Sequence, residues 1–284
     1  MIPVEDLLRF IREDAPWGDV TSEAVVPDVA CRAVVRANDP GTVAGLAEAR
    51  ALFEHFGVTV RERSVDGRAV APGAILLELD GPARAVLLVE RTALNIIGRM
   101  SGIATRTREA VDAVRTVSPD VRVAATRKTA PGLRVLDKKA VMLGGGDPHR
   151  YCLSDMVLIK DNHLVLVPLP EAIRRARRES IYRTVEVEVE TAENAVTAAL
   201  AGAEIILLDN MAPDAVRETV RALVERGLRD RLILEVSGGV GAGDLAGYAA
   251  TGIDIISMGA LTHTVRNFDV SLDILKGAGT VRVP

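Results

Sequence analysis

The segment TVEVEVE, residues 184–190, decides between two architectures for the second half of this chain. Side chains alternate between the two faces of a strand, so its glutamates (Glu186, Glu188 and Glu190) share one face and its valines share the other. An open sheet with helices on both sides would bury this acidic row against a helix layer. A barrel avoids that conflict, because the valines meet the surrounding helices and the glutamates point into the lumen or its mouth. We therefore expect a barrel in which these carboxylates have cations or a metal as partners.

The sequence around this segment repeats one pattern: a Val/Ile/Leu-rich run, a polar or Gly-rich stop, and an amphipathic stretch rich in Ala, Arg and Glu. This alternation is typical of βα units with parallel strands. The predicted strands are VRVAAT (121–126), DMVLIK (155–160), TVEVEVE (184–190), EIILLDN (204–210), RLILEVSGG (231–239) and DIISMGALT (254–262). The alternative for TVEVEVE is an exposed edge strand with a solvated acidic face, and its parallel neighbours argue against that alternative.

Nearly every predicted strand ends in polar or charged residues. In a (β/α) barrel the active site lies at the C-terminal ends of the strands. Those ends carry Thr126-Arg127-Lys128, Lys160-Asp161-Asn162, Glu188 and Glu190, Asp209-Asn210, Ser237-Gly238-Gly239 and Gly259-Ala260. His149-Arg150 adds further cations between the first two strands. A cation cluster inside a chain of net charge −4 predicts a small, highly anionic substrate.

Composition narrows the class of partner. The 284 residues suffice for a barrel of roughly 200 residues and a smaller domain. Aromatic residues make up 3% of the chain and its net charge is negative, so we expect no nucleic-acid partner. No apolar run has the length of a membrane span, and MIPVEDLLRFIRED lacks the cationic start of a signal peptide, so we expect a cytoplasmic protein without a membrane partner. Cys152 is expected to be a small buried residue rather than a nucleophile.

The first hundred residues predict a separate α+β domain. CRAVVRAND (31–39) and VTVRERS (58–64) have the pattern of half-exposed strands, with a helix over 45–57 between them, and 70–90 reads as strand, turn and strand. Two helices, over 90–97 and 106–116, are expected to lead into the barrel. We place an N-terminal α+β domain at residues 1–102, joined by 267–284, and the barrel domain at 103–266.

Taken together, the motifs resemble the quinolinate phosphoribosyltransferase family, also called nicotinate-nucleotide pyrophosphorylase (carboxylating), over almost the whole chain. The matching segments are WGDVTS (17–22), ERTALNIIGRMSGIAT (90–105), TRKTAPGLRVLDKKAV (126–141), GGGDPHR (144–150), LIKDNH (158–163), VEVEVE (185–190), LLDNM (207–211), SGGV (237–240) and GALTH (259–263). The resemblance implies an α/β fold, an incomplete (β/α) TIM-like barrel with an N-terminal α+β sandwich domain. It also implies the reaction of quinolinate with phosphoribosyl pyrophosphate, with Mg²⁺, to give nicotinate mononucleotide, pyrophosphate and CO₂ in NAD biosynthesis.

The resemblance also implies roles for individual residues. Quinolinate, with its two adjacent carboxylates, would contact Thr126, Arg127, His149, Arg150, Lys160 and, from the partner subunit of a homodimer, Arg91. Phosphoribosyl pyrophosphate would contact Lys128, Arg134, Glu188, Asp209, Ser237, Gly238, Gly239, Gly259, Ala260 and His263. Glu188 and Asp209 would hold Mg²⁺, largely through water. Lys128, Lys160, Glu188 and Asp209 would be the catalytic residues.

Two alternatives remain at this stage. One is a related phosphoribosyltransferase with another acceptor, such as the ModD-like proteins. The other is a barrel lyase that forms a Schiff base on Lys160, because a lysine at a strand end beside carboxylates also suits that chemistry.

Overall fold

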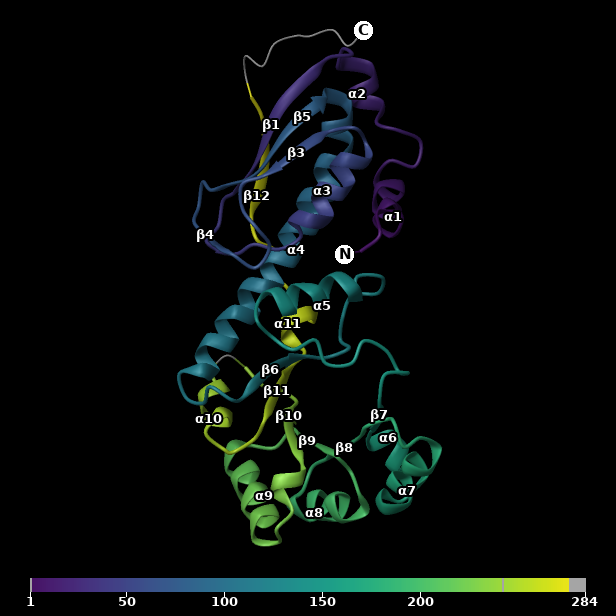
Figure 1. The fold of residues 1–284 in the computed structure, drawn as a ribbon, viewed down its shortest axis with the longest axis vertical. Coiled ribbons are helices and arrows are strands. Elements are labelled where there is room, and N and C mark those ends of the chain that lie inside the picture. Colours follow the sequence, from purple (N-terminus) through teal and green to yellow (C-terminus); the bar gives the residue numbers. More distant parts are fainter. Residues whose placement is uncertain (1, 242, 276–284) are drawn as a thin grey trace. The chain divides into compact units, whose positions relative to one another are not determined.

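A computed structural model describes residues 2–241 and 243–275 of the chain (Figure 1). The chain divides into two compact units. The first unit comprises the described parts of residues 1–106, 135–144 and 265–284, and the second comprises 107–134 and 145–264. The helix α4 (Ala83–Arg115) runs from the first unit into the second. The predicted domain boundary between residues 102 and 103 falls inside this helix.

The second unit is built on a parallel sheet of six strands, in the order β6-β11-β10-β9-β8-β7. These strands are β6 (Arg122–Ala125), β7 (Val157–Ile159), β8 (Val185–Val189), β9 (Ile205–Asp209), β10 (Ile233–Ser237) and β11 (Ile255–Met258). All six predicted strands are therefore confirmed, each somewhat shorter than its apolar run. The sheet does not close into a full barrel within the described chain. At one edge β7 pairs with β8. At the other edge β6 pairs with β11 and forms one further bridge, between Ala124 and Asp147.

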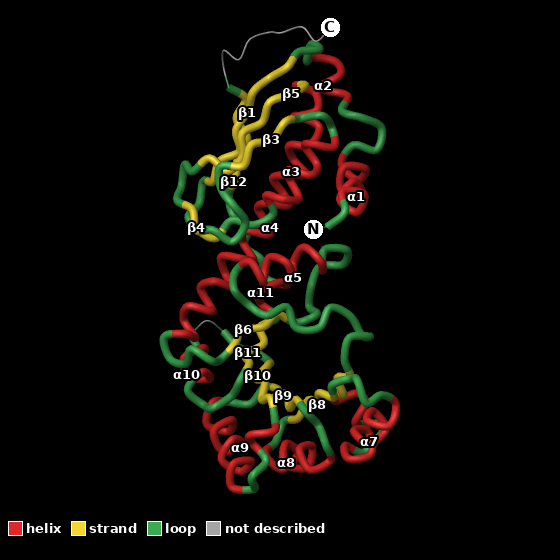
Figure 2. Tube along the Cα trace, in the orientation of Figure 1, coloured by secondary structure: helices red, strands yellow, loops and turns green. Residues whose placement is uncertain are grey.

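Helices cover the outer side of this sheet, as Figure 2 shows for the helices beside β8, β9 and β10. The helices and the short 3-10 turn of this unit are α6 (Asp161–Leu164), α7 (Leu169–Glu179), α8 (Ala192–Ala201), α9 (Pro213–Glu225), η1 (Arg229–Arg231), α10 (Leu245–Ala249) and α11 (Ala260–His263). Local sequence sets their ends: Thr191 caps α8 by accepting the Asn194 N–H at 3.2 Å, and Gly202 ends that helix with φ 99°.

The strand β8 behaves as its alternation predicts. Its three valines, Val185, Val187 and Val189, are buried in the hydrophobic core that the sheet shares with the helices. Glu186 and Glu188 occupy the opposite face, and β8 lies between β7 and β9. The alternative of an exposed edge strand is therefore wrong. Burying apolar surface on one face stabilises the sheet, at roughly 25 cal/mol per Å². The other face carries the polar side chains that can take part in binding or catalysis.

The first unit contains an antiparallel sheet in the order β12-β1-β5-β3 and a two-stranded ribbon of β2 and β4. Its strands are β1 (Ala30–Ala37), β2 (Gly41–Thr42), β3 (Thr59–Glu62), β4 (Ala69–Val70), β5 (Ile75–Pro82) and β12 (Val270–Ile274). Its other helices are α1 (Val4–Asp14), α2 (Val20–Val25), α3 (Leu46–His55) and α5 (Arg134–Leu143). The strand β12 brings the C-terminal segment back to β1, and residues 276–284 of the predicted 267–284 segment lie outside the described residues.

The helix α4 corrects the sequence analysis, which divided this region into a strand before residue 90 and two separate helices. One 33-residue helix replaces them. Val86, Val89, Ala93 and Ile97 are buried at helical spacing. Gly98 and Gly102 do not break the helix but allow another segment to approach it, because a Cβ at Gly102 would lie 2.2 Å from the Arg266 carbonyl oxygen.

Among the described helices, none combines the length and the apolarity that crossing a membrane requires.

Candidate active site

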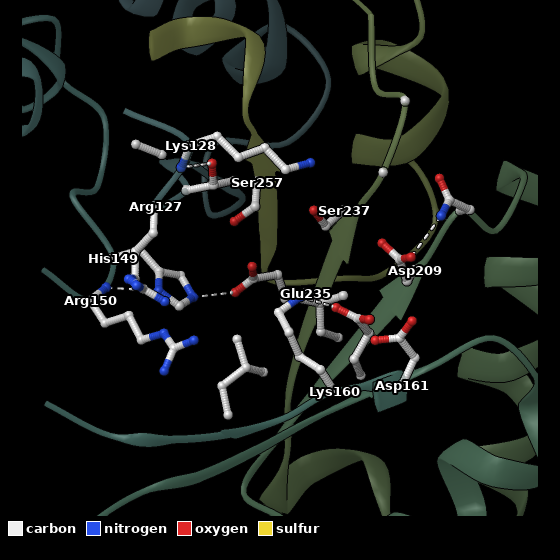
Figure 3. A pocket seen from close by; sticks show the side chains of 18 of the residues that line it. Arg127, Lys128, His149, Arg150, Lys160, Asp161, Asp209, Glu235, Ser237 and Ser257 are labelled. Carbon is white, nitrogen blue, oxygen red and sulfur yellow. Dashed lines mark hydrogen bonds and ion pairs between the residues drawn. The ribbon is translucent and has the colours of Figure 1, made fainter. Parts of the chain in front are cut away.

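A cavity of about 610 Å³ lies at the C-terminal ends of the strands in the second unit (Figure 3). This volume is in the range of small-molecule sites. Residues from β6, β7, β8, β9, β10 and β11, or from the loops that follow them, line the cavity. The parallel topology explains this gathering, because it places every strand's C-terminal end at the same edge. The predicted residues it brings together are Thr126, Arg127, Lys128, His149, Arg150, Lys160, Glu188, Asp209, Ser237, Gly238 and Gly239.

One side of the cavity is cationic. Arg127 follows β6, and its Nε is buried without a hydrogen-bond partner among the described residues. Arg150 is 9% exposed, and burial followed by the charge of Arg127 lowers its pKa from the ordinary value. Lys128 extends from the same loop as Arg127, which is fixed by the hydrogen bond from Lys128 N–H to Thr126 Oγ1 at 3.1 Å. Two close guanidinium groups with an unsatisfied donor are suited to carboxylate or phosphate oxygens.

The opposite side is acidic. Lys160 Nζ forms an ion pair with Glu188 Oε2. Asp209, at the end of β9, accepts a hydrogen bond from Asn210 Nδ2 at 2.6 Å. Burial, and then the charge of Glu188, raises the pKa of Asp209 above its ordinary value. A carboxylate pair with this mutual repulsion is stabilised by a further cation, so the donor set fits a hard divalent ion such as Mg²⁺.

The glycines after β10 complete this edge. Gly238 has φ 90°, and a Cβ there would lie 2.3 Å from Asn210 Oδ1 and 2.8 Å from Asn210 N, so the position requires glycine. Gly239 follows with φ 62° and open space around it. Successive backbone N–H groups in such a turn form a concavity suited to anions.

A buried cluster stands beside the cationic side. His149 Nε2 lies 3.2 Å from Glu235 Oε2 and 3.5 Å from Glu186 Oε2. The side chains of Glu186 and Glu235 are 0% and 2% exposed. Burial lowers the pKa of His149, but hydrogen bonds and charges from these two glutamates outweigh it and raise the pKa to about 10. The partner of Glu186 is thus His149, from the segment between β6 and β7.

Some predicted residues lie outside the cavity lining. Arg134 donates to Thr129 Oγ1 and to the Tyr151 carbonyl oxygen, both at 3.1 Å. Gly259 adjoins Lys128, and Thr262 Oγ1 donates to the Lys128 carbonyl oxygen at 2.9 Å, so the Gly259, Ala260 and His263 segment supports the loop that carries Lys128. Arg91 is exposed on α4 in the first unit.

Two polar residues of the lining were not predicted from the sequence, and the burial of a third residue nearby was predicted wrongly. Glu235 and Ser257 line the cavity, and Ser257 Oγ is buried without a hydrogen-bond partner in the described chain. The signal for Glu235 was available, because it stands two residues before Ser237 on β10 and therefore on the same face. Cys152 was expected to be buried but is exposed, with Sγ 3.0 Å from Asp155 Oδ1.

A cationic side facing a carboxylate pair, at the C-terminal edge of parallel strands, defines the class: an α/β-barrel enzyme for small polyanionic substrates. The family models agree with this class and sharpen it. The model of the quinolinate phosphoribosyl transferase C-terminal domain matches residues 103–273, and that of the N-terminal domain matches 19–101. The chain belongs to the quinolinate phosphoribosyltransferase family.

Individual relatives agree. The chain is 44% identical over 274 residues to a probable nicotinate-nucleotide pyrophosphorylase (carboxylating) of Methanothermobacter thermautotrophicus, covering 95% of this chain and 98% of the relative. It is 37% identical to the human nicotinate-nucleotide pyrophosphorylase (carboxylating), covering 93% and 89%. The crystal structure of the Ehrlichia chaffeensis nicotinate-nucleotide pyrophosphorylase superposes with a TM-score of 0.91 at 31% identity, covering 97% and 99%. These comparisons lend no support to the ModD-like or Schiff-base alternatives.

Proposed function

We propose that this protein transfers the phosphoribosyl group of phosphoribosyl pyrophosphate to quinolinate and that decarboxylation follows, giving nicotinate mononucleotide, pyrophosphate and CO₂. The observation that carries the proposal is the arrangement of the cavity. Its cationic side suits a dicarboxylate, and its acidic side suits the positive charge that develops on the ribose during transfer. The product is a precursor of NAD.

Quinolinate binds at the cationic side. Arg127 and Arg150 take its two adjacent carboxylates, since a guanidinium can bind a carboxylate through two parallel hydrogen bonds. Thr126 and His149 complete this pocket, and Lys160 borders it from the acidic side of the same cavity. The buried, unpartnered Arg127 Nε supports the assignment, because a substrate oxygen would satisfy it.

Phosphoribosyl pyrophosphate binds along the glycine edge, which is the turn of Gly238 and Gly239 after β10. Ser237, Gly238 and Gly239 receive its 5′-phosphate through backbone N–H groups, with Gly259, Ala260 and His263 beside them. Lys128 and Arg134 neutralise the pyrophosphate as it leaves. Since Arg134 holds the Thr129 and Tyr151 loops together, it reaches the diphosphate only if those hydrogen bonds exchange.

Glu188 and Asp209 are the residues that would hold Mg²⁺. When bound, this ion supplies positive charge that offsets the diphosphate. The raised pKa of Asp209 beside Glu188 supports the assignment, because a bound cation would relieve the repulsion between the two carboxylates.

Transfer begins with attack of the quinolinate nitrogen on C1 of the ribose. The N–C1 bond forms as the C1–O bond breaks, and pyrophosphate leaves with the electron pair. Glu188 stabilises the positive charge on the ribose electrostatically. The pyridinium then accepts the electron pair of the bond to the departing carboxylate as CO₂ is released, and the ring carbon takes up a proton from a lysine or from water. The protein's residues position the two substrates and neutralise their charges, so no covalent nucleophile is required.

Lys160 in this site does not suit Schiff-base chemistry. Its amine is held in an ion pair with Glu188, which would have to break before that nitrogen could attack a carbonyl carbon.

The acting species is a homodimer in which Arg91 of one subunit reaches the quinolinate pocket of the other. Exposure of Arg91 on α4 supports its availability to a second chain. A cytoplasmic location stays a prediction.

The proposal is tested by the acceptor that the protein uses. With phosphoribosyl pyrophosphate and Mg²⁺, purified protein should consume quinolinate and leave nicotinate unchanged. Arg127→Ala should lower kcat/KM for quinolinate by about a hundredfold, since truncating one side of a charge-assisted pair leaves a carboxylate poorly bound. Arg226→Ala, at an exposed arginine just after α9, is the matched control and should behave as wild type. Turnover of nicotinate but not of quinolinate would contradict the proposal.

A further inference from the structure

A histidine–carboxylate cluster, made of His149, Glu186 and Glu235, lies at the cationic side of the cavity. Figure 3 labels two of its members, His149 and Glu235. Glu186 is on β8 and Glu235 on β10, the two strands that flank β9. Their side chains approach the same imidazole nitrogen from these two strands. Apart from the 3.5 Å contact of Oε2 with His149 Nε2, the oxygens of Glu186 have no hydrogen-bond partner in the described part of the chain. Two buried carboxylates around one nitrogen are costly unless a proton or a cation lies between them.

The hydrogen bond at the other ring nitrogen, Nδ1, indicates that a proton lies on Nε2, between the ring and the two carboxylates. His149 Nδ1 is 2.7 Å from the backbone N–H of Arg150, which donates to it. A nitrogen that accepts a hydrogen bond carries no proton, so the ring proton is on Nε2, directed at Glu235 and Glu186. The two glutamates raise the His149 pKa, but a second ring proton would have to displace the Arg150 N–H from Nδ1. Nε2 carries a proton in either state.

The same three side chains have the chemistry of metal ligands, with donor atoms within 4.8 Å of one another. A metal on Nε2 would require the ring proton to be on Nδ1. The Arg150 N–H occupies that position, and the nearby guanidinium groups also oppose a second positive ion. The geometry therefore favours a proton over a metal ion in this cluster.

The cluster also fixes the backbone that presents Arg150. His149 has φ 52°, a left-handed conformation that is unfavourable for a residue with a side chain. Three contacts hold it there: the His149 N–H donates to Asp147 Oδ1 at 2.8 Å, Nδ1 accepts from Arg150, and Nε2 faces the glutamates. Glu186 also acts directly on Arg150, since its charge favours the charged form of the guanidinium.

We propose that Glu186 and Glu235 are positioning residues: they hold the His149 ring through its Nε2 proton, and through that ring they hold Arg150 in place for a substrate carboxylate. This inference rests on the proposed function, because it assigns Arg150 to quinolinate. The cluster acts on one substrate only. Its loss should weaken quinolinate binding and leave the phosphoribosyl pyrophosphate site on the glycine edge intact.

Steady-state kinetics of Glu235→Gln and Glu235→Leu test the inference. Glutamine keeps the volume and one acceptor for the Nε2 proton, whereas leucine keeps neither acceptor. KM for quinolinate should rise about tenfold in Glu235→Gln and further in Glu235→Leu, since hydrogen bonds to charged groups are the strong ones. KM for phosphoribosyl pyrophosphate should stay within about twofold of wild type. Glu186→Gln should resemble Glu235→Gln, and Glu225→Gln, at an exposed glutamate at the end of α9, is the matched control.

Equal KM values for quinolinate in wild type, Glu235→Gln and Glu235→Leu would overturn the inference, as would a parallel rise in both KM values. If wild type itself does not consume quinolinate, the proposed function fails instead, and the two failures are therefore distinguishable.

A second readout needs no substrate. The chain has four histidines, so ring ¹⁵N–¹H correlations of ¹⁵N-histidine-labelled protein can be assigned through a His149→Gln variant. We expect His149 Nε2 to be protonated at neutral pH, and its proton to exchange with water faster in Glu235→Gln than in Glu225→Gln. An unprotonated Nε2, or stoichiometric Zn²⁺ binding that Glu235→Gln abolishes, would overturn the inference.

Discussion

At the scale of single residues, the acidic side of the cavity shows a conflict between stability and function. Asp209 is partly buried beside Glu188, and burial raises its pKa before any substrate is present. A group whose pKa is higher in the folded than in the unfolded chain stabilises the fold below the unfolded pKa and loses that contribution as pH rises through the folded pKa. The ionised carboxylate therefore costs stability at neutral pH, where the proposed reaction uses it.

This conflict predicts the behaviour of Asp209→Asn. At neutral pH and without ligands, the variant should melt about 2 °C or more above wild type, because the buried charge is gone. The difference should disappear as pH falls below the ordinary aspartate pKa, since both side chains are then neutral. Thermal melts across pH measure it, and turnover should be lost at every pH. A variant that melts below wild type at neutral pH would show that Asp209 is well compensated in the free protein.

Residues that act through others were harder to predict than those that touch substrate. Arg127 and Lys160 stood out because they are cations at strand ends. Glu235 was missed because it lies inside an apolar run, where only its register with Ser237 marks it. The contact between His149 and Glu186 could not be predicted, since it depends on a loop whose backbone takes φ 52° at a histidine.

At the scale of elements, the parallel strands were predictable and the long helix was not. TVEVEVE carries its own register, because a shift by one residue would exchange the buried valines with the glutamates. The α4 region contains Gly98 and Gly102, which are unfavourable inside a helix, and an apolar run after Pro82, which has the pattern of a strand. Judged from a few neighbouring residues at a time, this sequence therefore predicts separate elements instead of one helix. The reason for these glycines is a backbone packed against the helix at Arg266 and Phe268, and no local pattern announces that contact.

The glycine turn after β10 leads to a prediction at this scale. Gly238→Ala should destabilise the second unit and abolish turnover, because its Cβ would overlap the Asn210 side chain and backbone and Asn210 adjoins Asp209. Gly227→Ala is the matched control: its φ of 65° imposes the same left-handed penalty, but nothing lies within 4 Å of the added carbon. Thermal melts should show a larger loss for Gly238→Ala than for Gly227→Ala. Equal losses would mean that the backbone conformation alone sets the cost.

At the scale of the whole molecule, each active site of the proposed dimer contains residues from both chains. Arg91→Ala and Lys160→Ala should each be nearly inactive alone. When the two are unfolded, mixed in equal amounts and refolded together, activity should return to about a quarter of wild type, because half of the dimers are mixed and each has one intact site. Mixed protein that stays inactive, although native mass spectrometry detects the mixed dimer, would show that Arg91 serves its own chain or no site.

The most direct measurement of the central claim follows the carboxylate that the reaction removes. Quinolinate labelled with ¹³C in the carboxylate next to the ring nitrogen is incubated with the protein, Mg²⁺ and phosphoribosyl pyrophosphate. We predict labelled CO₂ in amounts equal to nicotinate mononucleotide and pyrophosphate, and none when phosphoribosyl pyrophosphate is omitted. Unlabelled CO₂, a phosphoribosylated pyridine that keeps both carboxylates, or no reaction with quinolinate at all would contradict the claim.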